Sequence, residues 1–197
     1  TDPSPGRFVF VMINDQTPLI TKAIGVGEDV LIDGAFGGEQ IVEQALRCVG
    51  KKMTVRHQRK DLTLVPFLVP HRDEHADTVG LRIEGPHRAL LYVPDTDAWE
   101  RWDPALERRL EGVSVALLDG TFFSGDELPD RGVRSIGHPP IRDTLARLGQ
   151  RDPHVEPRIL FTHLNHSNPA VDPRSPAARE LRSAGYGVAE EGDEIRL

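Results

Sequence analysis

Residues 158–166 read RILFTHLNH, an apolar run that ends in a threonine and is followed by two histidines. The run Arg158–Thr162 predicts a buried strand. A histidine placed directly after a strand offers an imidazole nitrogen of the kind that binds Zn²⁺ or Fe²⁺. His163 and His166 would face different ways in an extended loop. We therefore expect His163 to bind a metal, and His166 to orient His163 or to contact substrate. A histidine that only caps backbone groups is the alternative at both positions.

The same arrangement, an apolar run followed by a histidine or a carboxylate, occurs three more times earlier in the chain. Thr63–Val69 precedes His71, Ala89–Val93 precedes Asp95, and Val113–Leu118 precedes Asp119. Imidazole and carboxylate groups at strand ends form the ligand set of a divalent metal. We therefore predict a metal site at the strand ends, with His71, Asp95 and His163 as its ligands.

The remaining candidates receive supporting roles. Asp119 leaves a very apolar run and therefore needs a partner, which makes us expect a paired, at least half-buried carboxylate that orients a ligand. His138, between a glycine and a proline, would contact a ligand or have no role. His75 would lie near the site or on the surface. Asp95, Asp119 and His138 are the candidate catalytic residues.

Each of these assignments has a structural alternative. His71 and His75 flank Asp73 and Glu74, so the segment is also compatible with a solvated loop held by an ion pair. Asp95 precedes a threonine, and an Asp-Thr pair is typical of a turn.

The remaining pattern predicts strands and helices that alternate in the second half, which favours a layered α/β or α+β fold in a single domain of residues 1–197. The expected strands, besides those above, are Arg7–Ile13, a hairpin across Ile20–Ile32, Met53–Val55, Val79–Glu84 and a closing hairpin of Tyr186–Ala189 with Glu194–Leu197. The expected helices are Gln40–Val49, Ala105–Leu110 capped by Asp103, Pro140–Leu148, and one that Ser175 begins and Gly185 ends.

Composition limits the classes of partner. The net charge of −7 over 197 residues makes nucleic acid an unlikely partner. No apolar run approaches the ~20 residues of a membrane span and no signal peptide is recognisable, so we expect a cytoplasmic protein with no membrane contact. Cys48 is the single cysteine, which excludes a disulfide framework within the chain and a cysteine-based zinc site. A homo-oligomer is compatible with the sequence.

Several motifs, taken in order, resemble those of metallo-β-lactamase-fold proteins. The similarity is greatest to the branch that contains pyrroloquinoline quinone biosynthesis protein B and its relatives. The motifs are VPHRDEHADTVG at 69–80, LLYVPDTDAWERWD at 90–103, ALLDGTFF at 116–123, IGHPP at 136–140 and FTHLNHSNP at 161–169. The resemblance covers residues 62–197, whereas residues 1–61 show no such likeness.

The resemblance implies an αββα sandwich with a metal site at one edge. By position, His71 and His163 match metal-binding histidines, and Asp95 matches an aspartate that bridges metals. Asp119 and His138 match an acidic residue and a histidine beside the metals. The family's HxHxDH motif is absent, so the N-terminal half is expected to be shortened or altered, with at most one tightly bound Zn²⁺ or Fe²⁺.

Together these features predict a metal-dependent hydrolase that acts on a small molecule or a peptide. Two alternatives remain open: an iron-dependent oxygenase or hydroxylase on the same fold, and a non-catalytic binding protein that lacks HxHxDH. In the hydrolase, Asp95 or Asp119 would orient the attacking water or accept its proton.

Overall fold

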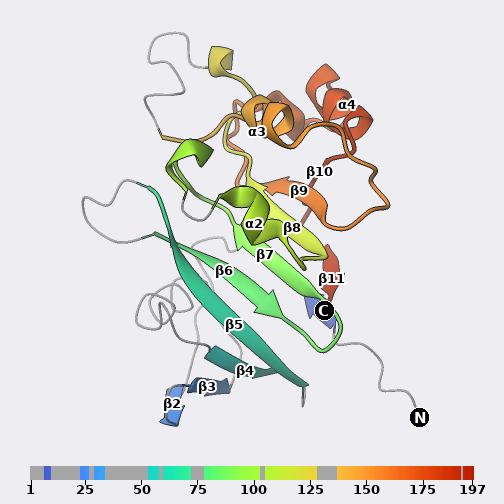
Figure 1. The fold of residues 1–197 in the computed structure, drawn as a ribbon. Helices are drawn as coiled ribbons and strands as arrows, with labels where there is room; N and C mark the ends of the chain where they lie inside the picture. The colour runs from blue at the N-terminus through green and yellow to red at the C-terminus, as the bar shows by residue number, and fades with distance from the viewer. Residues whose placement is uncertain are drawn as a thin grey trace.

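The fold was analysed in a computed structural model. The structure describes residues 7–9, 23–26, 29–33, 53–57, 60–71, 78–102, 105–127, 137–191 and 193–197. Within them, nine strands form one mixed sheet in the order β10-β9-β8-β7-β6-β5-β4-β3-β2 (Figure 1). Their bounds are β2 Ala23–Val26, β3 Asp29–Asp33, β4 Met53–His57, β5 Lys60–Val69, β6 Thr78–Glu84, β7 Ala89–Val93, β8 Val115–Asp119, β9 Arg158–Thr162 and β10 Gly187–Val188.

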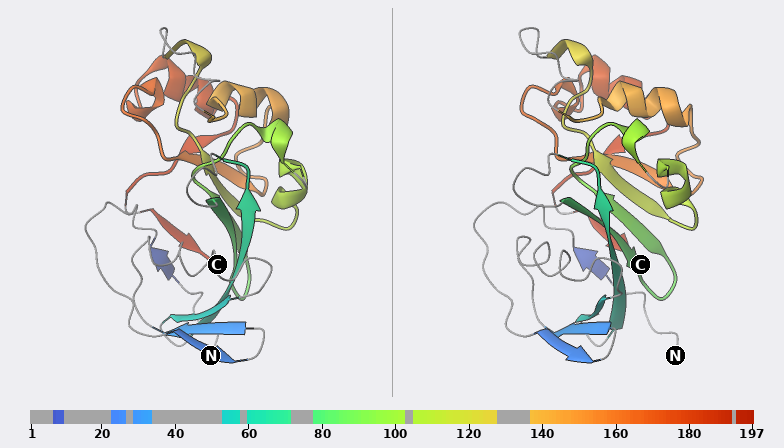
Figure 2. Two further views of the ribbon diagram at one scale, coloured as in Figure 1. Left: turned by 90° about the vertical axis from the view of Figure 1, so that its left-hand side faces the viewer. Right: turned by 60° about the vertical axis from the view of Figure 1, so that its left-hand side comes forward.

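The sheet has an antiparallel part and a parallel part. Strands β4 to β7 pair antiparallel with one another, and β7 to β10 run parallel. A second, two-stranded sheet joins β1 (Arg7–Val9) to β11 (Glu194–Arg196). Figure 2 shows this pair on the other side of the main sheet from α2. The β1–β11 pairing joins the N-terminal strand to the C-terminal segment of the chain.

Helices cover one face of the parallel part of the sheet. They are α2 (Leu106–Leu110), α3 (Ile141–Leu148) and α4 (Pro176–Ser183), with the 3₁₀ turns η1 (Trp99–Arg101), η2 (Gly125–Glu127) and η4 (Pro169–Val171) between them. Leu91, Val93, Leu118 and Phe161 point from the strands into this layer, where they meet residues of all three helices. Each such buried side chain contributes about 1.5–3 kcal/mol, so this core fixes the helices on the sheet.

The opposite face of the sheet is apolar as well. Leu81, Ile83, Leu90 and Leu117 alternate with the residues of the first face and are also buried. A strand with both faces buried is expected in a layered α/β protein. The observed architecture therefore agrees with the expected α/β sandwich.

Most expected elements are present, and local signals explain their ends. The hydroxyl of Ser175 accepts a hydrogen bond from the Ala178 N–H at the start of α4. Gly149 ends α3 with a φ of +71°. The β2–β3 hairpin and strands β7 and β9 lie where the pattern predicted them.

Two sequence expectations are wrong. The cap of α2 is Ala105, which has no side-chain cap hydrogen bond, and not Asp103. The expected closing hairpin does not form, because β10 joins β9 in parallel and β11 pairs with β1. Between β10 and β11 the Asp193 N–H donates to the Glu190 carbonyl, and Ile195 and Leu197 are buried.

The expected helix Gln40–Val49, with Cys48, lies outside the described residues. Among the described residues, no helix is long and apolar enough to cross a membrane.

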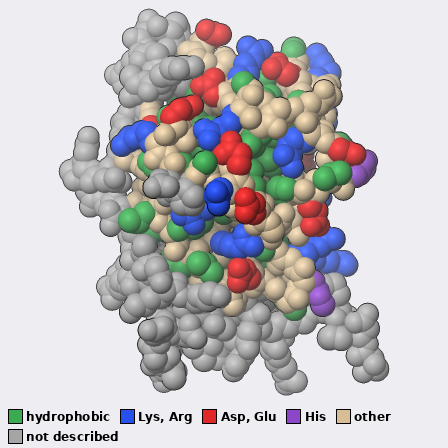
Figure 3. Space-filling view, in the orientation of Figure 1, with side chains coloured by type: hydrophobic (Ala, Val, Ile, Leu, Met, Phe, Trp, Pro, Cys, Tyr) green, Lys and Arg blue, Asp and Glu red, His purple; other side chains and the backbone are tan. Residues whose placement is uncertain are grey.

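On the face shown in Figure 3, acidic and basic side chains are interspersed. Two ion pairs join the helices: Arg147 of α3 with Glu107 of α2, and Arg142 of α3 with Glu180 of α4.

Candidate metal centre

The parallel strands explain why residues far apart in sequence meet. Asp95 follows β7 by two residues, Asp119 is the last residue of β8, and His163 follows β9 directly. These three strands are neighbours and run in the same direction, so their carboxyl ends lie at one edge of the sheet. The edge beyond the carboxyl ends of parallel strands is where α/β proteins bind ligands.

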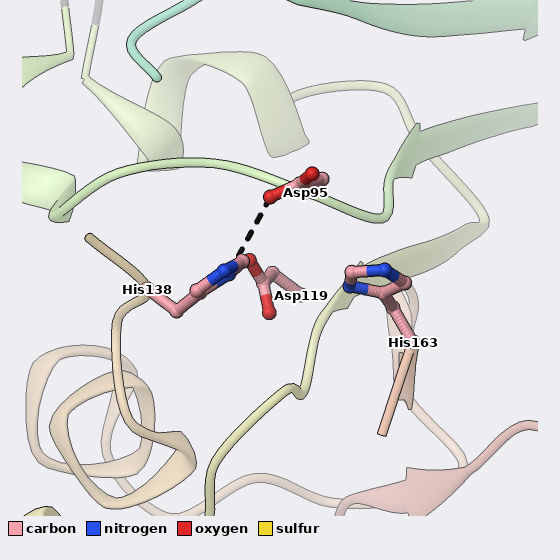
Figure 4. Close-up of side chains that lie close together, drawn as sticks. All are labelled: Asp95, Asp119, His138 and His163. Carbon is pink, nitrogen blue, oxygen red and sulfur yellow. Dashed lines mark hydrogen bonds and ion pairs between the residues drawn. The ribbon is translucent and has the colours of Figure 1, made fainter. Parts of the chain in front are cut away.

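A fourth side chain completes the cluster. His138, from the segment before α3, joins Asp95, Asp119 and His163, and one ligand-type atom from each lies within 4.8 Å of the others. Figure 4 shows the four side chains gathered at this edge. His71 lies outside this set of four, but its Nε2 is 3.4 Å from Asp95 Oδ1.

Asp119 is the most tightly held member. Its side chain is 0 % exposed, and each oxygen has two neighbouring donor groups. Oδ1 accepts from the Thr121 N–H (2.8 Å) and the Thr121 hydroxyl (2.7 Å). Oδ2 accepts from the Thr96 N–H (3.0 Å) and faces His138 Nδ1 at 2.8 Å. The expectation of a paired, buried carboxylate is confirmed, and four contacts fill the roughly four lone-pair sites of a carboxylate.

Asp95, in contrast to Asp119, has an oxygen whose hydrogen bonding is not satisfied by the described residues. Its Oδ1 is buried, yet it has no hydrogen-bond partner among the described residues. The same oxygen faces two imidazoles, His71 Nε2 and His138 Nδ1, at 3.4 Å each. His71 Nδ1 is also buried without a hydrogen-bond partner in the described part of the chain. Buried polar atoms are normally satisfied, so these two require an explanation.

The backbone of His163 is unusual. With φ at +60°, it is the one residue other than glycine with positive φ in the part of the chain that the structure describes. The left-handed conformation costs about 1–2 kcal/mol for a residue that carries a Cβ. Its Nδ1 lies 3.1 Å from the Thr121 hydroxyl. Backbone strain of this kind gathers at functional sites.

Two threonines that the sequence did not single out organise the site. Thr121 places its hydroxyl among Asp119, His138 and His163. Thr96, which is fully buried, bonds Asp119 through its N–H and accepts from Trp102 Nε1 (2.9 Å). The position of Thr121 two residues after a buried aspartate was the available signal, because such a hydroxyl can bond the carboxylate it follows.

Neighbouring loops hold these residues in place. Asn168 Nδ2 donates to the Gly120 carbonyl (2.7 Å), and its Oδ1 caps η4 by accepting from the Ala170 N–H. The Gly120 N–H donates to the Thr162 carbonyl at 2.8 Å, which joins the ends of β8 and β9.

The last two candidates are His75 and His166. His75 lies outside the described residues. His166 is exposed, and its N–H donates to the Asn165 side chain, so it does not belong to the cluster.

Comparison with known proteins gives several matches. Residues 25–164 match the family model for the beta-lactamase superfamily domain, a match that takes in part of residues 1–61. Coenzyme PQQ synthesis protein B of Xanthomonas euvesicatoria pv. vesicatoria is 30 % identical over 155 residues, which are 69 % of this chain and 51 % of that protein. The protein of the same name from Methylobacterium nodulans is 33 % identical over 129 residues, 63 % of this chain and 42 % of its own.

A solved structure agrees in fold. The crystal structure of Zn²⁺-bound PqqB from Methylobacterium extorquens superposes with a TM-score of 0.56 at 24 % identity, covering 69 % of this chain and 50 % of that chain. The chain spans about half the length of the curated relatives that it matches. The family model covers most of the chain, and the fold agrees with it, so the chain belongs to the beta-lactamase superfamily.

Proposed function

We propose that this protein is a metal-dependent hydrolase that holds one divalent cation between His71, Asp95 and His163. The observation that carries the proposal is the buried Asp95 Oδ1, which faces two imidazole nitrogens but has no hydrogen-bond partner among the described residues. A buried carboxylate oxygen without a donor is costly, and a cation removes that cost.

The spacing of one donor pair fits a metal ion. Two ligand atoms that each lie about 2.1 Å from a tetrahedral ion are ~3.4 Å apart. His71 Nε2 and Asp95 Oδ1 are 3.4 Å apart, which is longer than a charge-assisted hydrogen bond and matches this spacing. Imidazole and carboxylate together suit zinc or iron.

A metal held by these residues would lower the pKa of a coordinated water toward ~7 and would polarise the bond to be cleaved. The other tasks fall to the protein. Asp119 is saturated by four contacts, so it serves to hold His138 and not to bind the ion. His138 is held by the contact between its Nδ1 and Asp119, and it lies beside Asp95. It is therefore placed to carry a proton between water and leaving group.

The substrate we propose is a small molecule or a peptide. The curated relatives are named for coenzyme PQQ synthesis, and a precursor of that pathway is a candidate for this chain. A second function has support from the donor composition. Two histidines and one carboxylate form the set that holds Fe²⁺ in oxygenases with open positions for O₂, so an iron-dependent hydroxylase on the same site is the alternative.

Metal content tests the proposal. The protein is stripped with chelator, reconstituted with Zn²⁺ or anaerobically with Fe²⁺, desalted and measured by mass spectrometry. We expect one equivalent in the parent and a loss of metal in His71→Ala and His163→Ala. The matched control is His154→Ala, which removes an exposed histidine and should keep the metal. Absence of metal from the parent, with both variants as stable as the parent, would instead favour a non-catalytic binding protein.

A further inference from the structure

The hydroxyl of Thr121 has three polar neighbours and a single proton to give. Its Oγ1 lies 2.7 Å from Asp119 Oδ1, 3.1 Å from His138 Nδ1 and 3.1 Å from His163 Nδ1. A hydroxyl donates once and accepts through two lone pairs. The direction of each bond can therefore be assigned by counting protons.

The carboxylate takes the hydroxyl proton. A carboxylate only accepts hydrogen bonds, and its contact with the hydroxyl is the shortest of the three. The Thr121 oxygen can then only accept from the imidazoles. His163 must consequently carry its proton on Nδ1 in order to bond this oxygen, and its Nε2 is left with the free lone pair.

His138 reaches the same state by another route. Its Nδ1 lies 2.8 Å from Asp119 Oδ2, so the carboxylate itself requires a proton on that nitrogen. Asp119 thus acts on His138 directly, whereas it reaches His163 only through the hydroxyl. In metal sites, the hydrogen bond at one ring nitrogen decides which nitrogen remains to bind the metal.

We propose that Thr121 is a positioning residue through which the buried Asp119 fixes the tautomer of His163, and that Nε2 is the ligand atom of this histidine. The assignment of Nε2 as a ligand atom rests on the proposed metal site. The tautomer itself is a property of the metal-free protein. The two can therefore be tested separately.

The first test is ¹⁵N NMR of histidine-labelled, metal-free protein at about pH 9, where an ordinary imidazole is neutral. The nitrogen that carries the proton has a distinct chemical shift, and His138→Gln and His163→Gln assign the signals. We expect Nδ1–H at both histidines in the parent. In Thr121→Val, His163 should change to Nε2–H while His138 stays as it was, and Thr121→Ser should restore the parent pattern.

Three results would overturn the inference. They are Nε2–H at His163 in the parent, an unchanged His163 in Thr121→Val, and a joint change of His138 and His163 in that variant. The last would mean that the hydroxyl supports the whole site and not one tautomer.

The second test is zinc affinity, measured by competition with a chromogenic chelator. Thr121→Val should bind zinc about 10–100-fold more weakly than the parent, and Thr121→Ser should bind as the parent does. The control is Thr144→Val, which removes another buried hydroxyl, the one that accepts from Trp99 Nε1 at 2.8 Å, and should leave affinity unchanged. Equal affinity in Thr121→Val and the parent contradicts the assignment of Nε2. A parent that binds neither zinc nor iron rejects the proposed function but leaves the tautomer result standing.

Discussion

At the scale of single residues, the two carboxylates of the site differ in what surrounds them. Asp119 has a full set of donors, whereas one buried oxygen of Asp95 has none among the described residues. The sequence predicted that Asp119 would be paired and buried, because a carboxylate that leaves a very apolar strand needs fixed partners. It did not predict Thr121 or Thr96, because the value of a hydroxyl depends on where its side chain points in the folded protein.

The left-handed backbone of His163 leads to a prediction about stability. Both His163→Gly and His163→Ala remove the imidazole, but only glycine adopts a φ of +60° without strain. We expect His163→Gly to be more stable than His163→Ala by about 1 kcal/mol in urea unfolding. At His154, which has negative φ, the same two substitutions should give the opposite order. If alanine is the more stable replacement at both positions, the strain at His163 is not real.

At the scale of elements, the ends of β8 and β9 approach so closely that only glycine fits at position 120. A Cβ there would lie 2.8 Å from Phe161 Cβ, 3.0 Å from the Thr162 carbonyl oxygen and 3.2 Å from Leu164 Cδ1. We expect Gly120→Ala to lower the free energy of unfolding by about 1–3 kcal/mol and to weaken metal binding, because Asp119 and Thr121 must shift. The control is Gly125→Ala, whose Cβ would meet no atom within 4 Å. Similar stabilities of the two variants would contradict the close approach.

Helices α2 and α3 are joined by a bidentate ion pair, which makes the stability of the protein depend on pH. Arg147 Nε and Nη2 donate to the two oxygens of Glu107 at 2.7 and 3.0 Å, and this contact lowers the pKa of Glu107. Because the folded pKa is the lower one, the pair stabilises the protein above the ordinary value of ~4.3 and is lost as the pH falls through the folded pKa.

The pair is exposed, so its contribution is only about 0.2–1 kcal/mol. We expect Glu107→Gln to lose this amount at pH 7 in urea unfolding and to match the parent once Glu107 is protonated. Exposed Glu191→Gln should match the parent throughout. A deficit of Glu107→Gln that is constant with pH would show that the effect is not electrostatic.

Elements with a strong local pattern could be predicted, and those set by distant partners could not. Strands β7 and β9 were predicted at their observed bounds, because each is a short, largely apolar run that a proline adjoins. Strands β10 and β11 have two and three residues, too few to specify a partner, and their true partners β9 and β1 lie far away in sequence. The position of the site could be predicted from the strand ends. Parallel neighbours bring their carboxyl ends to one edge of the sheet wherever they lie in the sequence.

At the scale of the whole molecule, the last residue joins the small β1–β11 sheet to the main one. Leu197 is 1 % exposed, and it lies so close to the β6–β7 turn that a Cβ at Gly85 would be 2.5 Å from its backbone carbon. A side chain buried this completely contributes through its own burial and through the packing of the residues around it. The attachment of the second sheet should therefore depend on this one leucine more than on the three residues of β11 that pair with β1.

We expect Leu197→Ala to lower the free energy of unfolding by about 2–5 kcal/mol and to speed hydrogen exchange of the amides in β1 and β11 ahead of those in β7 to β9. Gly85→Ala should have the same regional effect, because its added Cβ would clash with Leu197. The control is Val155→Ala at a residue that is 56 % exposed, where the change should be within about 0.5 kcal/mol of zero. Uniform acceleration over both sheets would mean that they unfold together and that the β1–β11 pair is no separate unit.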